Sequence, residues 1–507
     1  MEYILSLDLG TSAIKVALFN EDGDLVVSSN QEYSLLTPTA LSVEVEIETY
    51  WNAFTSGVND VLSRSKVNTD SIRVIGISAQ GETLIPVDSS GQPLRNAIVW
   101  MDNRAQEEAA ELELAFKNSD LYGITGQVSI VPTWPASKIL WIKKNEPEVY
   151  KKVDKYLLIE DYFIYRLTGK FVAEGSLLCS TVYWDIIKKK YWTEMLDYLG
   201  VNEEQLPAIC ESGDVIGRVQ SNIAAETGLS TLTVVCTGVL DQVAGAIGVG
   251  NVEPGVFSEC TGSALAIVST VDTPFCDPQK RMPCHYHGMP DTYMVHTFTT
   301  GGMVLKWFRD RFCENEMAVE EASDIDAYEL MSIAAAKVPP GSEGLIMLPH
   351  LQGAMAPEND PKAKGVFYGL TLTHTRAHFT RAIMESIAFL LRKNIEVIED
   401  MGIPVNEIRS LGGGARSSFW GQLKADVTGK PVVVTCNEEE ACLGAAIVAG
   451  TGIGMFSNLK EASRRMVSVK NRYEPNLSNK GIYDDVYRKY LELYTSLRPM
   501  FAKETGD

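Results

Sequence analysis

The feature of the sequence that most limits its fold is a short apolar hairpin near the start, "YILSLDLGTSAIKVALFN" (residues 3–20), which carries one acid. Two strand-like runs flank the turn Gly10-Thr11-Ser12, and Asp8 lies in the first run. A carboxylate in an apolar strand is unfavourable unless a partner satisfies it. The hairpin therefore predicts a sheet in which a polar or charged partner lies near Asp8, beside the turn. The hairpin alone does not identify this partner.

A second hairpin of the same kind opens the other half of the chain, "GVFSECTGSALAIVST" (residues 255–270), and Thr261 lies 250 residues after Thr11. Two interpretations fit these residues alone. The hairpins are either an internal repeat, one in each half, or two ordinary β-turns that are alike by coincidence. As a repeat, the two turns could grip a polyphosphate, because backbone N–H groups in tight turns converge on anions and hydroxyls add donors.

Strand-like and helix-like segments alternate along most of the chain, which predicts an α/β protein whose sheets are covered by helices. We expect a helix at 51–63, strands at 72–79 and 94–100, and a charged helix at 104–117. A long amphipathic helix should begin near residue 375 and stop at Gly402, and "YDDVYRKYLELYTSL" predicts a terminal helix.

The best candidate for a linker is "IGVGNVEPG" (residues 247–255), because it is rich in glycine and contains a proline. It divides the chain of 507 residues into two predicted domains, 1–246 and 255–507. A chain of this length has room for more than one hydrophobic core.

The formal net charge of −21 argues against a broad surface for nucleic acid or anionic membrane, although a local basic pocket for a phosphorylated ligand remains compatible with it. No apolar run approaches the ~20 residues of a membrane span. We see no signal peptide at the start, and the nine cysteines are scattered without a CxxC pair. This pattern is typical of reduced thiols, so we expect a cytoplasmic protein without nucleic-acid or membrane partners.

Two acids are candidates for chemistry. Asp8 stands beside a turn that could hold phosphate, and Mg²⁺ prefers one or two carboxylates together with phosphate oxygens. Lys15 follows on the next strand and could neutralise phosphate charge. Asp241 comes after the strand-like "LTVVC", at the start of a run of small residues. It could be a general base projecting from a strand end, or simply an N-cap.

Two further stretches suggest ligand contacts. The glycines of "LGGGARSSFW" lie between a strand and a helix, where a ligand can approach the backbone closely, but the stretch lacks GxGxxG spacing and the chain has no P-loop. Two strand-like runs end in polar residues, namely Gln80, Glu82, Trp100, Asp102 and Arg104. An aromatic ring beside carboxylates and amides suits a polyhydroxyl compound, and exposed loops are the alternative.

Several stretches together resemble the FGGY carbohydrate kinases, in the order expected for that family: "LDLGTS", "DQVAGAIGVG", "ECTGSA", "KGVFYGL", "LGGGARSSFW" and "CLGAAIVAG". "PENDPKAKGVFYGLT" and "LGGGARS" are most similar to xylulokinases within this family. The resemblance implies two actin-like ATPase domains of the ribonuclease H type around a central cleft, where ATP and a sugar meet. It also implies that the two hairpins are counterparts.

The resemblance assigns roles to residues of this chain. Asp241 corresponds to the catalytic base, and Asp8 and Asp241 correspond to the acids that hold Mg²⁺. The residues that correspond to ATP contacts are Thr11, Ser12, Lys15, Thr261, Gly262, Gly302, Gly414, Ala415 and Ser418. The residues expected to bind the sugar are Gln80, Gly81, Glu82, Trp100, Asp102, Asp241 and Gln242.

The expected sugar pocket departs from the patterns of two subfamilies. Where this chain has Gln80-Gly81-Glu82-Thr83, xylulokinases carry Gln-Met-His-Gly and glycerol kinases carry Gln-Arg-Glu-Thr. Asp241-Gln242 also matches the glycerol kinase pair. Because glycine replaces the arginine at position 81, the pocket has more room, which favours a pentulose as substrate. A polyol kinase of the glycerol or erythritol type is the alternative.

Two other readings of the sequence compete with a sugar kinase. An actin-like ATPase of the chaperone or filament class would share the hairpins but lack the polar runs at 80–83 and 100–104. A sugar-binding regulator derived from a kinase would not need both Asp8 and Asp241. The resemblance is also compatible with a homodimer, although the sequence shows no dimer motif.

Overall fold

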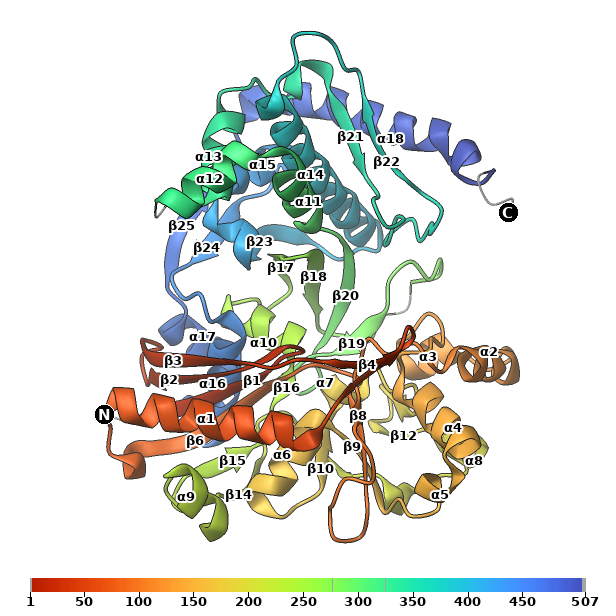
Figure 1. Cartoon of the computed structure of the whole chain (residues 1–507), viewed down its shortest axis with the longest axis vertical. Helices are drawn as coiled ribbons and strands as arrows, with labels where there is room; N and C mark the ends of the chain where they lie inside the picture. The colour runs from red at the N-terminus through yellow and green to blue at the C-terminus, as the bar shows by residue number, and fades with distance from the viewer. Residues whose placement is uncertain (1, 276, 324, 504–507) are drawn as a thin grey trace. The chain divides into compact units, whose positions relative to one another are not determined.

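A computed structural model describes residues 2–275, 277–323 and 325–503. The chain forms two compact units (Figure 1). Unit 1 comprises the residues up to Glu253 together with Thr270–Val295 and Glu439–Ser468. Unit 2 comprises Pro254–Ser269, His296–Glu438 and the described residues from Val469 onward. The predicted division into 1–246 and 255–507 follows chain order, whereas the packing returns two later segments to unit 1.

The central sheet of unit 1 has the strand order β14-β15-β6-β1-β2-β3, and β16 also pairs with β6. Strand β1 is antiparallel to β2 and parallel to β6, and β6 is parallel to β15 and β16. The bounds are β1 Tyr3–Leu9, β2 Ala13–Asn20, β3 Leu25–Glu32, β6 Ile72–Ala79, β14 Val215–Arg218, β15 Val234–Cys236 and β16 Val239–Leu240.

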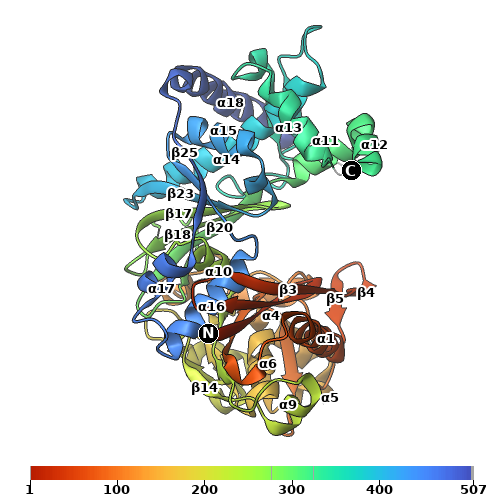
Figure 2. The same cartoon turned by 90° about the vertical axis from the view of Figure 1, so that its left-hand side faces the viewer.

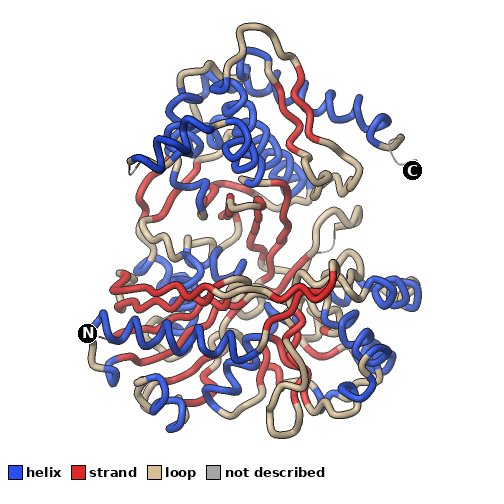
Figure 3. The backbone as a smooth tube through the Cα atoms, viewed as in Figure 1, coloured by secondary structure: helices blue, strands red, loops and turns tan. Residues whose placement is uncertain are grey.

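Helices cover both faces of this sheet, as Figure 3 shows by colour. Val16 of β2 packs against α1 (Ile47–Ser65) at Gly57, and Val16 is the cross-strand partner of Leu7. Ile4 packs against α16 (Glu440–Gly452) at Gly450. Because side chains alternate along a strand, Leu7 and Ile4 point to opposite faces, and so α1 and α16 lie on opposite sides of the sheet.

Small residues allow α16 to pack closely against α10 and β6 of unit 1. A Cβ built on Gly444 of α16 would lie 1.8 Å from the carbonyl oxygen of Ala244 in α10 (Asp241–Gly248). A Cβ on Gly76 of β6 would lie 2.3 Å from the carbonyl oxygen of Ala445. Figures 1 and 2 show α10 and α16 side by side. Any side chain at these two glycines would separate the layers, so this close packing requires glycine.

A second sheet of unit 1 has the order β4-β5-β8-β7-β9, with bounds β4 Leu36–Thr39, β5 Ser42–Val45, β7 Leu84–Val87, β8 Ala97–Ile98 and β9 Lys155–Leu158. Strands β7 and β8 are antiparallel, with Leu84 opposite Ile98. The start of β7 and the end of β8 therefore lie at the same edge. The other helices of unit 1 are α2 Gln106–Ala115, α3 Leu121–Thr125, α4 Pro135–Asn145, α5 Pro147–Tyr150, α6 Ile159–Thr168, α7 Gly175–Leu178, α8 Thr193–Leu199, α9 Ser221–Thr227 and α17 Leu459–Met466.

The main sheet of unit 2 is built on β17 (Gly255–Thr261), which is antiparallel to β18 (Ala264–Val271) and parallel to β23 (Val405–Leu411). Beyond β23 lie β24 (Val432–Thr435) and β25 (Val469–Tyr473), and beyond β18 lies β20 (Tyr293–Thr300). β19 (Cys284–Tyr286), which belongs to unit 1, pairs with the first residues of β20, Tyr293–Val295, which are also in unit 1. The helices of unit 2 are α11 Met303–Phe312, α12 Glu314–Ala322, α13 Ala327–Ala336, α14 Arg376–Asp400, α15 Ser418–Thr428 and α18 Lys480–Phe501. The strands β21 Ile346–Pro349 and β22 Gly365–Tyr368 pair antiparallel as a separate two-stranded sheet.

The observed elements agree with the predicted α/β class, and most predicted helices and strands are present. The strand predicted at 94–100 is wrong in length, because only Ala97–Ile98 pair as β8. The first two residues of the predicted linker, Ile247 and Gly248, belong to the last turn of α10. Among the described residues, no helix is both long enough and apolar enough to cross a membrane.

Candidate active site

The strand register places three polar side chains together on one face of the unit 1 sheet. Asp8 of β1 is directly opposite Lys15 on β2 and Ser78 on β6. It lies an even number of residues from Ile4, and it therefore faces α16. The Ser78 hydroxyl donates to Asp8 Oδ1 at 2.8 Å. Burial raises the pKa of Asp8, although the Ser78 hydrogen bond and the charge of Lys15 act in the opposite direction.

Lys15 meets an acid at the start of α16. Its Nζ lies 2.8 Å from Glu439 Oε2, and the two side chains are 39% and 21% exposed. Burial lowers the pKa of Lys15, but the hydrogen bond to Glu439 and the charges of Glu439 and Asp8 outweigh this effect, so the pKa is raised overall. Lys15 is therefore a cation beside the first turn, and its partly exposed ion pair with Glu439 holds it there.

Asp241 is the first residue of α10, and its Oδ1 accepts a hydrogen bond from the Gln242 N–H at 2.7 Å. Burial raises its pKa to about 8, and the negative charges of Asp8 and Glu82 add to that effect. The charges of Asp8 and Glu82 act on Asp241, so a carboxylate of β1 and one of the 80–83 run each lie near the start of α10. Strongly perturbed acids are typical of functional sites.

The chemistry of this acid cluster suits a divalent cation that also binds phosphate. A carboxylate whose pKa is raised by neighbouring carboxylates, as that of Asp241 is, gains from a cation beside it, and Mg²⁺ takes one or two carboxylates together with phosphate oxygens. Asp8 and Asp241 are the residues of this cluster that could hold it. In the described part of the chain, no group of three or more His, Cys, Asp or Glu side chains forms a metal cage of protein ligands alone.

The two polar runs that were expected to bind sugar lie at one edge of the second sheet, because residues 80–83 precede β7 and residues 100–104 follow β8. A buried ammonium ties them together. Lys138 of α4 is fully buried, and its Nζ donates to the carbonyls of Glu82 at 2.9 Å and Val99 at 3.0 Å. Burial lowers the pKa of Lys138 to about 7.

Within the first run, Gln80 and Glu82 are held differently. The Gln80 Nε2 donates to the Gly10 carbonyl at 3.0 Å, and its buried Oε1 has no hydrogen-bond partner among the described residues. Glu82 has a φ of 56°, and burial raises its pKa while a hydrogen bond with Ser180 opposes this. A Cβ on Gly81 would lie 3.1 Å from Leu240 Cδ1, next to Asp241. Gly81 therefore borders the acid cluster.

Within the second run, Trp100 and Asp102 face different environments. Trp100 is 36% exposed, and its Nε1 donates to Thr11 Oγ1 at 2.8 Å. Asp102 is fully buried and accepts from the N–H of Val43 at 2.6 Å and from the guanidinium of Arg104 at 2.8 to 3.0 Å. These donors engage both carboxylate oxygens and tie Asp102 to β5 and Arg104, while its contact with a sugar stays a prediction.

In unit 2, the structure brings together four of the residues expected to bind nucleotide. The Gly302 N–H donates to the Gly262 carbonyl at 2.8 Å. A Cβ on Gly414 would lie 2.5 Å from Thr261 Cβ, so the glycine turn packs directly on the second hairpin. Gly414 and Ala415 belong to the short helix η4 (Gly413–Arg416), and Ser418 begins α15.

A buried ion pair lies beneath the second hairpin. The Nζ of Lys424 donates to Glu259 Oε1 at 2.6 Å and to Thr261 Oγ1 at 2.9 Å, and Thr261 Oγ1 donates to Glu259 Oε2 at 2.6 Å. Glu259 and Lys424 are 0% and 1% exposed. The Ser410 hydroxyl also donates to Glu259. The hydroxyl proton of Thr261 is therefore used in the hydrogen bond to the buried Glu259.

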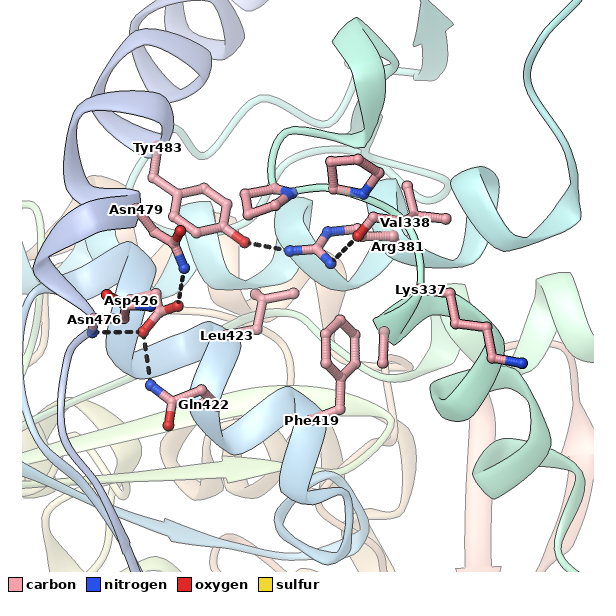
Figure 4. Close-up of a pocket in the computed structure, with 13 residues that line it drawn as sticks. Lys337, Val338, Arg381, Phe419, Gln422, Leu423, Asp426, Asn476, Asn479 and Tyr483 are labelled. Carbon is pink, nitrogen blue, oxygen red and sulfur yellow. Dashed lines mark hydrogen bonds between the residues drawn. The ribbon is translucent and has the colours of Figure 1, made fainter.

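A pocket of about 460 Å³ opens beside α15 in unit 2. Figure 4 shows Phe419 and Leu423 projecting into it, while Lys337 points away. Arg381 closes one side and donates to Tyr483 Oη and the Val338 carbonyl. On another side Asp426 accepts from Gln422, Asn476 and Asn479. The pocket thus combines an aromatic ring with a polar rim, and it starts one residue after Ser418.

Sequence reasoning missed several residues that support these sites, namely Ser78, Lys138, Glu259, Lys424 and Glu439. One of them had a signal of the same type as Asp8, because Glu259 also interrupts an apolar strand. Its partner Lys424 lies 165 positions away, and nothing in the sequence pairs the two. Lys138 stands among other lysines of α4, so its burial could not be inferred from the pattern.

The chain is similar to known proteins over most of its length. The model of the FGGY family of carbohydrate kinases, N-terminal domain, matches residues 3–248, and that of the C-terminal domain matches residues 261–453. A xylulose kinase of Bacillus subtilis (strain 168) is 30% identical over 501 residues, covering 99% of this chain and 98% of that protein. A gluconokinase of the same organism is 30% identical, covering 93% and 92%.

A crystal structure of ligand-bound xylulose kinase from Lactobacillus acidophilus has a TM-score of 0.89 and 28% identity, covering 99% of this chain and 100% of that one. This similarity confirms the predicted fold class, with two α/β domains.

Proposed function

Because the chain belongs to the FGGY family of carbohydrate kinases, we propose that it transfers the γ-phosphate of ATP to a hydroxyl of a pentulose such as xylulose. A sugar kinase needs a base for the hydroxyl, a cationic setting for the phosphates and a polar pocket for the sugar. The observation that carries the proposal is the placement of Asp241 at the start of α10, beside the charges of Asp8 and Glu82.

Asp241 is the general base of the proposed reaction. It accepts the proton of the sugar hydroxyl as the bond from oxygen to phosphorus forms, and the bond from the γ-phosphorus to the β,γ-bridging oxygen of ATP breaks. With a pKa of about 8, Asp241 is near the value at which a base works well at neutral pH. A magnesium ion held by Asp8 and Asp241 would supply positive charge that favours the ionised carboxylates and offsets the charge of the phosphates.

Two sets of residues serve the nucleotide in this proposal. Thr11, Ser12 and Lys15 hold phosphate oxygens through N–H, hydroxyl and ammonium donors, as a tight turn beside a cation can do. In unit 2, Thr261, Gly262 and Gly302 remain predicted nucleotide contacts, and the N–H of Gly302 holds the second turn by donating to the Gly262 carbonyl. The adenine ring takes the pocket beside α15, because Phe419 offers an aromatic face and the pocket adjoins Ser418.

The substrate pocket favours a sugar larger than glycerol. Where glycerol kinases carry an arginine this chain has Gly81, and a Cβ there would already lie 3.1 Å from Leu240 Cδ1, so no long side chain projects from this position toward Asp241. Glu82 and the Gln80 Oε1, which no described residue engages, offer polar groups for hydroxyls. The xylulose kinase relatives favour a pentulose, and the gluconokinase relative of equal identity makes an aldonate the first alternative. A polyol is the second.

A coupled assay of ADP release tests the proposal. Purified protein with ATP and Mg²⁺ is offered ketoses, aldoses, aldonates and polyols one at a time, and kcat/KM is compared. We expect D-xylulose or another pentulose to give the highest value. Glycerol as much the best substrate would overturn the substrate assignment, and ATP turnover that no compound stimulates would overturn the kinase assignment.

A further inference from the structure

The turn of the first hairpin is held in place by three side chains from other parts of unit 1. The carbonyl oxygen of Gly10 accepts a hydrogen bond from Gln80 Nε2 at 3.0 Å and another from the Tyr33 hydroxyl. The Thr11 hydroxyl oxygen accepts one from the indole Nε1 of Trp100 at 2.8 Å. Gln80 and Trp100 come from the two runs assigned above to the sugar pocket, so the sugar runs and the phosphate turn share direct contacts.

These contacts fix the direction of two donors on Thr11. In a trans peptide, the carbonyl of Gly10 and the N–H of Thr11 point in opposite directions. Because Gln80 and Tyr33 hold the carbonyl on one side, the Thr11 N–H points to the other. A hydroxyl has one proton and two acceptor positions. Since the indole N–H occupies one acceptor position, the Thr11 hydroxyl proton must point away from Trp100.

Neither donor of Thr11 is used by the described part of the protein. No hydrogen bond joins the Thr11 N–H or its hydroxyl proton to another described group. Thr11 is only half-buried, so a ligand can reach it. Two oriented donors beside Lys15 form a site for an anion, and the turn meets this condition only while its hydroxyl oxygen is engaged by Trp100.

We propose that Trp100 is a positioning residue for the nucleotide: its indole N–H holds the Thr11 hydroxyl as a donor toward a phosphate oxygen. The inference rests on the proposed function and extends it, because Trp100 then acts on ATP as well as on the sugar. If Trp100 only packed against the sugar, it would act through the face of its ring. Trp100 as a positioning residue acts through its N–H, and the two roles can be separated by a change that keeps a ring.

A double-mutant cycle tests the inference with the nucleotide alone. Isothermal titration calorimetry measures the Kd of Mg²⁺–AMP-PNP, without sugar, for the wild type, Trp100→Phe, Thr11→Val and the double variant. We expect each single change to weaken binding about fivefold, the size of one hydrogen bond. The double variant should bind no more weakly than Thr11→Val, because the indole N–H has no target once the hydroxyl is gone.

Two outcomes would overturn the inference. Trp100→Phe could leave the Kd unchanged, or the two effects could multiply in the double variant, and both results mean that the indole N–H does not act through Thr11. Thr11→Ser keeps a hydroxyl and should bind within twofold of the wild type. Failure of the wild type itself to bind Mg²⁺–AMP-PNP would overturn the proposed function and the inference with it, so the two failures differ in their result.

Trp51→Phe is the matched control. The indole Nε1 of Trp51 donates to Glu226 at 2.8 Å elsewhere in unit 1, so the change removes an equivalent hydrogen bond without contacting the turn. We expect it to lower the melting temperature but to leave the Kd of Mg²⁺–AMP-PNP unchanged. A weaker Kd for Trp51→Phe equal to that of Trp100→Phe would show a general effect of losing an indole N–H, and it would contradict the inference.

Discussion

The two hairpins of this chain share a plan but use their acids in opposite ways. In β1–β2, Asp8 accepts one hydroxyl donor from Ser78 and keeps a raised pKa on the face that also holds Lys15. In β17–β18, Glu259 is fully buried and receives Lys424, Thr261 and Ser410. Asp8 can therefore still accept hydrogen bonds from a ligand, whereas the carboxylate oxygens of Glu259 are engaged by donors of the protein.

The threonines of the two turns differ in the same way. Thr11 accepts a hydrogen bond from Trp100 and keeps its proton for a ligand, whereas Thr261 gives its proton to Glu259 and accepts from Lys424. A buried charge is stable only when it is paired and hydrogen-bonded, so unit 2 uses its acid to fix the loop. The same turn can therefore serve chemistry in one unit and support in the other.

The largest expected contrast is in turnover. Asp8→Ala should lower kcat about 100-fold or more, because it removes a carboxylate assigned to the magnesium ion, which supplies several kcal/mol to the transition state. Sugar affinity should change less than twofold. Steady-state kinetics with the best sugar of the screen measures both values. If Asp8→Ala turned over within a few-fold of the wild type, the claim that the acid of the first hairpin serves the reaction would be contradicted.

The next contrast is in stability. Lys424→Met leaves Glu259 buried without its cation, so the free energy of unfolding should fall by about 3–5 kcal/mol. Urea unfolding measures it, and Lys424→Met with Glu259→Leu should recover most of the loss. Lys15→Met is the matched change in the first hairpin, and it should cost less than about 1 kcal/mol because its ion pair is part-exposed. Equal losses for the two lysines would contradict the comparison.

The same substitution at the two threonines tests the comparison of the two hairpins further. Thr261→Val leaves buried partners of the hydroxyl unsatisfied and should lower the free energy of unfolding by about 1–3 kcal/mol. Thr11→Val should lower it by less than about 0.5 kcal/mol, since the side chain is half-exposed. Thermal and urea unfolding of both variants check this order. A larger loss at Thr11 than at Thr261 would reverse the roles assigned here.

The smallest expected effect is on pH dependence. A base is inactive when it is protonated, so kcat/KM for the sugar should fall as the pH drops through the pKa of Asp241, which is about 8 in the metal-free protein and lower once a magnesium ion binds Asp8 and Asp241. Glu82→Gln removes a negative charge near Asp241, which should lower the pKa of Asp241 and shift the acid limb downward by less than about one unit. A shift to higher pH would contradict the assignment of this limb to Asp241.

The sequence predicted the parts of the fold that depend on local pattern. Strand β6 matches the predicted run at 72–79, and α14 matches the long amphipathic segment. The placement of α16 in unit 1 could not be predicted, because it depends on contacts of Gly444 and Gly76 with distant backbone. Local periodicity shows that a segment is helical but not which sheet it covers.

The candidate site was predictable only as far as residue type allowed. Asp8 and Asp241 stood out because carboxylates at strand ends in apolar surroundings are unusual, and the structure places them near each other in unit 1. Asp102 stood out as a polar residue at the end of a strand-like run, but its carboxylate is used by Arg104 and the Val43 N–H. The sequence cannot tell a carboxylate that awaits a ligand from one that the protein already satisfies.

The most direct test of the account is the rate of ADP release by Asp241→Asn with ATP, Mg²⁺ and the best sugar of the screen. A general base contributes about 10²- to 10⁴-fold, so the account predicts a loss of that size while the Kd for the sugar stays within a few-fold. A rate equal to that of the wild type, with the variant folded and the sugar bound, would contradict it.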